Sequence, residues 1–209
     1  PFLTVEDFPA LDGSTACIPL MAQMLADTTG MDLEEAQSII SVSTTAYAWE
    51  SFGLYNTDTK MLVVYEAPDS VKEELEAANV QLEQKPIGVD ALVFIVNENN
   101  PVKSLTRQQL KDIYAGKITN WKEVGGPDEE ILLVTRPSSS GTRALFKNWA
   151  LNGEEEASNE ALETDDSGTL LQTVEQNKGA IGYVALSYLV NDDTVKTVSI
   201  DGVAPTLEN

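Results

Sequence analysis

Short apolar runs alternate with helix-like segments along the chain, and this alternation restricts the possible folds more than any other feature. The helix-like segments carry apolar residues at helical spacing, as in LTRQQLKDIYAG, where Thr106 is placed as an N-cap and Gly116 follows the last turn. The strand-like runs, most of them with continuous apolar centres, are KMLVVYEA, VDALVFIVN, ILLV, GAIGYVAL and VKTVSI. Strands and helices in alternation indicate an α/β architecture with mixed, mostly parallel sheets.

Three further segments carry local signals. LEEAQSII predicts a short helix that leads into a strand-like stretch at residues 38–43, SIISVS. SVKEELEAANV is amphipathic and predicts a helix with Ser70 as its N-cap. The acidic residues 152–166 predict a solvated, partly helical segment.

The composition limits the class of protein. The 209 residues suffice for one large or two small domains, and 42% hydrophobic with 22% charged residues is typical of a soluble globular chain. No apolar run approaches the roughly 20 residues of a membrane helix. Thirteen basic against 34 acidic residues give a net charge of −21, which argues against nucleic acids and anionic membranes as partners. The single Cys17 excludes an internal disulfide framework.

The chain contains no histidine. This absence removes the Ser-His-Asp and Cys-His catalytic devices, the common general base and the commonest zinc ligand. An enzyme would have to rely on carboxylate, lysine or N-terminal chemistry. We therefore expect a binding protein with no catalytic residues, no metal site and no cofactor.

Three helix starts carry small hydroxyl residues: Gly13-Ser14-Thr15, Ser43-Thr44-Thr45 and Ser140-Gly141-Thr142. A helix start has unpaired N–H groups and partial positive charge, Ser and Thr add O–H donors, and glycine allows close approach. If the three converge, they would surround a small tetrahedral anion, and Arg136 could supply one full positive charge. Taken singly, each triplet is also explained as an ordinary N-cap, and Arg136 as a surface or ion-pair residue. RPSSSGTR lacks the lysine and glycine spacing of a P-loop, which argues against nucleotide hydrolysis.

Four segments resemble, in this order, a known family: DGSTACIPL, VDALVFIVNENNPVKSLTRQQLKDIYAGKITNWKEVGG, RPSSSGTR and GAIGYV. The family is that of the PstS-like phosphate-binding proteins of bacterial phosphate ABC transporters, and the likeness runs from about residue 9 over nearly the whole chain. It implies a type II periplasmic-binding-protein fold, with two α/β lobes that close on a ligand in a cleft at their hinge. The implied lobes are residues 1–87 plus 183–209 and residues 88–182.

The resemblance also implies a phosphate site, position by position. Its members are Thr15, the N–H of Ala16, Ser43 with Thr44 as the alternative, Glu66, Arg136, Ser140, Gly141 and Thr142. Glu66 stands where the family places an aspartate after a strand. An ionised carboxylate there would accept the proton of monohydrogen phosphate, whereas sulfate offers only lone pairs. The other interpretation of Glu66 is a solvated residue beyond a strand end.

The function implied by the resemblance is that of a solute-binding protein. Such a protein would be extracytoplasmic and monomeric, anchored to the membrane through a removed N-terminal segment, and would deliver inorganic phosphate to the permease of an ABC importer. A second hypothesis is a surface or signalling module of the same fold that senses an anion or contacts a protein without transport. A hydrolase acting on phosphorylated substrates is disfavoured by the missing histidines.

Overall fold

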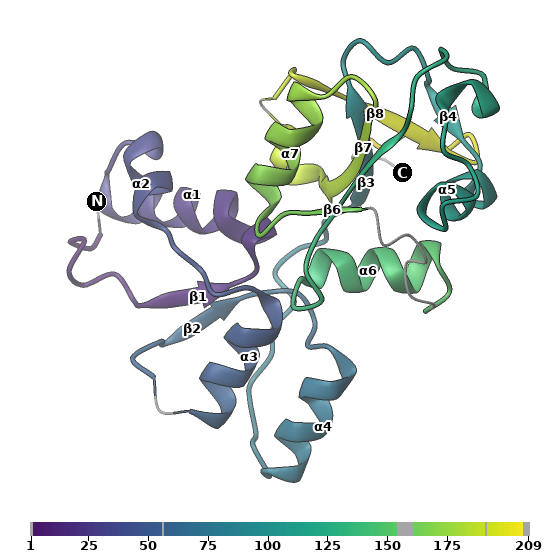
Figure 1. Cartoon of the computed structure of the whole chain (residues 1–209). Coiled ribbons are helices and arrows are strands. Elements are labelled where there is room, and N and C mark those ends of the chain that lie inside the picture. The colour runs from purple at the N-terminus through teal and green to yellow at the C-terminus, as the bar shows by residue number, and fades with distance from the viewer. Residues whose placement is uncertain (1, 56, 154–160, 191, 207–209) are drawn as a thin grey trace. The chain divides into compact units, whose positions relative to one another are not determined.

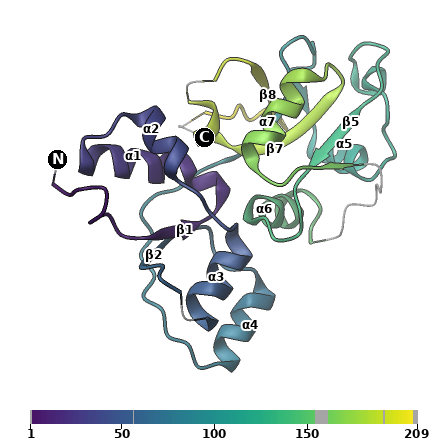
Figure 2. The ribbon, with the colours of Figure 1, turned by 60° about the vertical axis from the view of Figure 1, so that its left-hand side comes forward.

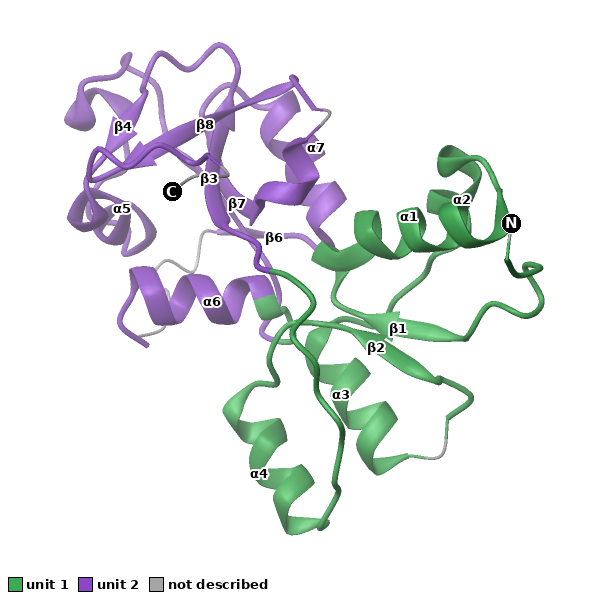
Figure 3. Cartoon of the chain, turned by 180° about the vertical axis from the view of Figure 1, so that it is seen from behind, with its two compact units in different colours: residues 1–88, 139–141 green, residues 89–138, 142–209 purple. Residues whose placement is uncertain are grey.

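The chain forms two units in a computed structural model that describes residues 2–55, 57–153, 161–190 and 192–206. Unit 1 comprises residues 1–88 and 139–141, and unit 2 comprises residues 89–138 and 142–209 (Figure 3). Both units combine helices with sheets, so the predicted α/β class is confirmed.

Unit 1 is built on a two-stranded parallel sheet, in which β1 (Leu11–Gly13) pairs with β2 (Met61–Val63). Its helical elements are η1 (Thr15–Cys17), α1 (Ile18–Thr29), α2 (Leu33–Ile39), α3 (Thr45–Leu54) and α4 (Asp69–Ala77). Helices α1 and α2 lie on one side of the strand pair, and α3 and α4 lie on the other (Figure 1 and Figure 2). The sheet is therefore covered on both faces by amphipathic helices.

Helix α1 follows the sequence pattern closely. Met21, Ala22 and Leu25 occupy its apolar stripe and are buried. Gly30 ends the helix in the left-handed conformation (φ 75°), and its N–H donates to the carbonyl of Ala26. Glycine adopts this conformation without the steric cost of a Cβ, which is why the helix stops there.

Two local predictions in unit 1 were wrong. Helix α4 begins at Asp69 with Pro68 at the cap, so Ser70 lies inside the helix instead of capping it. Residues 38–43 form no strand, because α2 continues through Ile39 and the N–H of Ser43 is bonded to the carboxylate of Asp12.

Unit 2 contains a six-stranded sheet. Its strands, in spatial order, are β4 (Ser104–Leu105), β8 (Val195–Ile200), β3 (Leu92–Asn97), β7 (Ala180–Ala185), β5 (Leu132–Thr135) and β6 (Leu162–Glu163). Strand β3 runs antiparallel to both of its neighbours, and the remaining pairings are parallel. The prediction of mixed, mostly parallel sheets is confirmed.

Helices cover both faces of this sheet (Figure 1). They are α5 (Arg107–Tyr114), α6 (Gly141–Ala150), whose first residue belongs to unit 1, and α7 (Ser167–Gln176), with the short η2 (Trp121–Val124) and η3 (Leu186–Leu189). Val93 and Ile95 of β3 pack in the α7 cluster, whereas Phe94 and Val96 belong to the larger cluster with α5 and α6. Burial on both faces explains why VFIV is continuously apolar.

The division at the C-terminal end differs from the lobes implied by the resemblance. Residues 183–209, expected in the first lobe, lie in unit 2. The reason is strand pairing: β8 lies beside β3, with Val198 opposite Phe94, and Val198 is buried in the core of unit 2.

The acidic stretch at 152–166 is only partly described. Residues 154–160 lie outside the described residues, and residues 162–163 form β6. Among the described helices, none has both the length and the apolarity needed to cross a bilayer.

Candidate anion-binding site

The first hydroxyl-rich loop leaves the sheet of unit 1 at Gly13. A Cβ at Gly13 would lie 1.9 Å from the backbone oxygen of Val63, so only glycine fits between the paired strands. Ser14 then donates its N–H to the Val63 carbonyl (3.2 Å), and its hydroxyl accepts the N–H of Tyr65 (3.1 Å). Thr15 and Ala16 follow in η1 and are buried.

The three hydroxyl-rich segments meet at Thr45, the first residue of α3. The hydroxyl oxygens of Ser14 and Thr45 are 2.7 Å apart, and Gly141 donates its N–H to the Thr45 hydroxyl (3.1 Å). Ala46 donates its N–H to the carbonyl of Ser139 (3.3 Å). Residues far apart in the sequence are thus joined within unit 1, as the anion hypothesis requires. The sequence analysis placed Thr45 in its triplet but did not name it as a site residue.

The start of α6 depends on a second close approach. A Cβ at Gly141 would lie 2.4 Å from the hydroxyl oxygen of Thr45. Glycine therefore lets the N-terminus of α6 reach that of α3, and Ser140 beside it is buried. Helices α3 and α6 have ten residues each, and the N–H groups at their N-termini meet at Thr45.

Thr44, the N-cap residue of α3, has an unfavourable backbone conformation. Its φ of 91° lies where a β-branched residue is rarely found. Its hydroxyl oxygen is buried and has no hydrogen-bond partner among the described residues. Such strain costs about 1–3 kcal/mol and is concentrated at functional sites, where a ligand contact can offset it.

Ser43 is held by a residue that the sequence analysis did not select. The carboxylate of Asp12 accepts hydrogen bonds from the N–H of Gly13 (2.7 Å), the N–H of Ser43 (2.7 Å) and the hydroxyl of Ser43 (2.5 Å). The available signal was the position of this acidic residue directly before the Gly-Ser-Thr triplet. Asp12 ties the first loop to the second, next to the Ser14–Thr45 contact.

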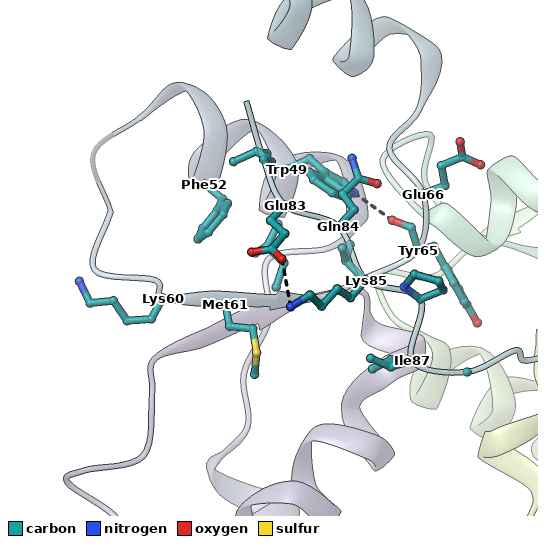
Figure 4. A pocket seen from close by; sticks show the side chains of 15 residues that line it. Trp49, Phe52, Lys60, Met61, Tyr65, Glu66, Glu83, Gln84, Lys85 and Ile87 are labelled. Atoms are coloured by element: carbon teal, nitrogen blue, oxygen red, sulfur yellow. Dashed lines mark hydrogen bonds and ion pairs between the residues drawn. The ribbon is translucent and has the colours of Figure 1, made fainter. Parts of the chain in front are cut away.

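Glu66 has the environment of a solvated residue. Its side chain is 79% exposed and forms an ion pair with Lys72 (2.9 Å). The pKa of Lys72 is raised, mainly by its hydrogen bond to Glu66. Glu66 also lines a pocket of about 460 Å³ in unit 1, together with Trp49 and Lys85 (Figure 4).

Arg136 follows β5 in unit 2 and is 1% exposed. Its guanidinium donates to the carbonyl of Thr164 (3.0 Å), the hydroxyl of Ser167 (2.8 Å) and the carbonyl of Asp165 (2.9 Å). Burial lowers the pKa of Arg136, yet a guanidinium remains charged at physiological pH. Thr142, in the first turn of α6, is also buried. Unit 2 thus contains a desolvated, oriented cation just before the third loop in the sequence.

Comparison with known proteins identifies the class. A sequence model of the PBP superfamily domain matches residues 54–207. The chain therefore belongs to the PBP superfamily of binding proteins.

Individual relatives narrow this assignment. A candidate phosphate ABC transporter substrate-binding protein from Clostridium perfringens, solved with bound phosphate, is 30% identical, with a TM-score of 0.74 over 96% of this chain and 79% of that one. The phosphate-binding protein PstS of Bacillus subtilis is 44% identical over 142 residues, 68% of this chain and 46% of the relative. PstS of Borreliella burgdorferi is 27% identical over 217 residues, 97% of this chain and 73% of the relative. Within its superfamily the chain is a PstS-like protein, of a family of transport receptors rather than enzymes.

These matches confirm the resemblance that the four sequence segments carried. The Bacillus subtilis and Clostridium perfringens relatives are both described as binding proteins, in agreement with the expectation of a binding protein rather than an enzyme. The chain spans about half the length of the Bacillus subtilis relative.

Proposed function

We propose that this chain binds inorganic phosphate as the solute-binding protein of an ABC importer. The observation that carries the proposal is the meeting of the three hydroxyl-rich segments at Thr45, beside the buried and unpartnered hydroxyl of Thr44. The phosphate bound by the Clostridium perfringens relative supports the choice of ligand.

The proposed site combines neutral donors with a single cation. The contributing residues are Thr15, Ala16, Ser43, Thr44, Glu66, Ser140 and Gly141 of unit 1 and Arg136 and Thr142 of unit 2. We infer that the two units are lobes that close on phosphate in a cleft at their hinge, as in type II periplasmic binding proteins. Capture and release would then be conformational steps in which no bond is made or broken.

An acidic protein can bind an anion in such a site. At physiological salt, charges separated by more than about 8 Å across solvent are largely screened, so most of the net charge of −21 acts weakly on the ligand. Each hydrogen bond to a charged ligand contributes about 1.5–3 kcal/mol. Several such bonds, with the buried Arg136, outweigh diffuse repulsion.

The partner and the location follow from the same proposal. A receptor of this family would act outside the cytoplasm, as a monomer held at the membrane by an N-terminal anchor, and would deliver phosphate to a membrane permease. Support comes from the family membership and from the Clostridium perfringens relative, described as an ABC transporter substrate-binding protein.

Titration with phosphate tests the proposal directly. We expect saturable heat on addition of phosphate in isothermal titration calorimetry, with a dissociation constant in the micromolar range or below, and much weaker heat with sulfate. Trp49 should report binding by fluorescence, because its indole N–H donates to the carbonyl of Tyr65 (2.9 Å), whose N–H donates to Ser14. Absence of any response at millimolar phosphate would refute the proposal.

Replacing Thr44 by glycine should separate stability from binding. Glycine accepts the φ of 91° without strain, so we expect the free energy of unfolding to rise by about 1 kcal/mol. Loss of the unpartnered hydroxyl should weaken phosphate binding about tenfold, the effect of one charge-assisted hydrogen bond. Urea denaturation and calorimetry measure the two effects.

Asn79→Gly is the matched control for Thr44→Gly. Asn79 also has a positive φ (54°) in unit 1, but it follows α4 and belongs to none of the three loops. Its replacement should leave the phosphate affinity unchanged. Equal affinity of Thr44→Gly and wild type would remove Thr44 from the proposed site.

A further inference from the structure

We propose that the turn at residues 164–167, together with Tyr183, holds Arg136 in place for the anion before the anion arrives. This inference rests on the proposed function, and it assigns a role to residues outside the set implied by the resemblance. Ser167 and Tyr183 are positioning residues here: they act on Arg136, and Arg136 acts on the ligand. All of these residues belong to unit 2.

The turn supplies acceptors for the Arg136 guanidinium. The carbonyl of Thr164 accepts the Nε–H (3.0 Å), the carbonyl of Asp165 accepts an Nη2 hydrogen (2.9 Å), and the hydroxyl of Ser167 accepts an Nη1 hydrogen (2.8 Å). These three acceptors are uncharged, so they orient the cation without neutralising it. A guanidinium is planar and rigid, and acceptors for all three of its nitrogens fix both its position and its plane. Because Arg136 and Ser167 are buried, water competes little for these hydrogen bonds.

The turn is itself fixed at both ends. At its start, Thr164 donates its N–H (2.9 Å) and its hydroxyl (3.2 Å) to the carbonyl of Thr135, the last residue of β5. At its end, Asp166 caps α7 by accepting the N–H (2.8 Å) and the hydroxyl (2.6 Å) of Thr169. The acceptors for the guanidinium therefore occupy fixed positions between a strand and a helix.

Tyr183 holds the backbone at the same place. Its hydroxyl accepts the N–H of Arg136 (3.3 Å) and lies 2.9 Å from the hydroxyl oxygen of Thr135. Its ring is buried and stacks on Phe146, with 4.4 Å between the ring centroids. The aromatic core of unit 2 thus positions the Tyr183 hydroxyl, and the hydroxyl positions the first residue after β5.

A cation fixed in this way favours binding, because its ordering is not left to the binding step. Immobilising a long side chain when a ligand binds lowers the affinity, and a side chain that is already ordered avoids this loss. The acceptors of the turn belong to unit 2, as Arg136 does, so they orient the cation whether or not a ligand is present. The network therefore raises the phosphate affinity through Arg136.

Ser167→Ala tests the guanidinium end of this network. The variant removes one of the three acceptors and keeps the Asp166 cap of α7, so the protein should fold. We expect the phosphate affinity to fall about tenfold, because the released guanidinium must be ordered again at each binding event. The NMR signals of the guanidinium N–H groups, assigned by their loss in Arg136→Lys, report the cause. Rotation of the Nη1 group should be slow in the wild type and fast in Ser167→Ala.

Tyr183→Phe tests the backbone end, with Tyr114→Phe as its matched control. Both tyrosines are buried in the same aromatic cluster, and each loses a hydroxyl while keeping its ring. The Tyr114 hydroxyl donates to the carbonyl of Val134 (3.3 Å), which is outside the network. We expect the phosphate affinity to fall about fivefold in Tyr183→Phe, and amide hydrogen exchange at Arg136 to become faster. Tyr114→Phe should change the phosphate affinity by less than about twofold.

The outcomes separate this inference from the proposed function. Calorimetric titration with potassium phosphate gives the affinities, and thermal unfolding checks that each variant is folded. A wild-type chain that binds no phosphate overturns both. If the wild type binds phosphate and folded Ser167→Ala and Tyr183→Phe bind it equally well, the positioning role alone is overturned. Weaker binding by Ser167→Ala with unchanged Arg136 signals, or equal losses in the two tyrosine variants, would also overturn it. If Ser167→Ala does not fold, the two tyrosine variants decide.

Discussion

Arg136→Ala should abolish phosphate binding and destabilise unit 2. The variant leaves the carbonyls of Thr164 and Asp165 and the hydroxyl of Ser167 without their donor. It also leaves a cavity in place of a side chain that is 1% exposed. We expect the free energy of unfolding to fall by about 3 kcal/mol and the phosphate affinity to fall at least about a hundredfold. Chemical denaturation and calorimetric titration measure the two quantities.

Two variants show whether the effect comes from the shape and burial of this guanidinium. Arg136→Lys retains a positive charge but cannot reach three divergent acceptors, so it should recover only part of the affinity. Arg107→Ala removes a half-buried guanidinium of unit 2 that stacks on Trp149, and phosphate binding should be unaffected. Wild-type affinity in a folded Arg136→Ala protein would show that the cation has only a structural role.

Gly13→Ala should unfold the sheet of unit 1 and with it the proposed site. The new Cβ would lie 1.9 Å from the Val63 carbonyl oxygen, a backbone atom of the paired strand that has no alternative rotamer. We expect the free energy of unfolding of unit 1 to fall by about 3 kcal/mol. Because Ser14 and Thr15 follow directly, phosphate binding should be lost as well. Amide hydrogen exchange, which reports on each unit separately, measures the change.

Gly88→Ala is the control for Gly13→Ala within the same unit. A Cβ at Gly88 would meet no atom within 4 Å. The free energy of unfolding of the Gly88→Ala variant should therefore differ from that of the wild type by no more than about 0.5 kcal/mol. Equal stability of the Gly13→Ala and wild-type proteins would show that β1 and β2 are farther apart at Gly13 than this close approach requires.

Much of the fold could be predicted because its signals are local. Helix α5 follows its N-cap residue Thr106 with a complete capping box, in which the side chains of Thr106 and Gln109 each accept the other's backbone N–H. Strand β3 was recognisable because burial on both faces requires an uninterrupted apolar run. The failure at Ser70 was also local, because the neighbouring Pro68 takes the cap position. The failure at residues 38–43 was not local, because the N–H of Ser43 is bonded to Asp12, 31 positions away.

The candidate site could be predicted only in part, because its sequence signals are local and its contacts are not. Hydroxyl and glycine residues at three helix starts were visible in the sequence, and the structure joins those segments in unit 1. The sequence could not show that Thr45 joins them. Nor could it show that Asp12 holds Ser43, or that Glu66 is exposed and paired with Lys72.

The sequence by itself determined the α/β class, the family, the acidic and histidine-free character and the three donor-rich loops. These follow from composition and from patterns within short windows, where each residue constrains its neighbours. Tertiary structure decided the partners: Ser14 with Thr45 across 31 positions, and Thr45 with Gly141 across 96. It also decided that β8 joins β3 in unit 2. Such pairings depend on which distant surfaces bury apolar area and satisfy polar groups together, and no local pattern encodes that choice.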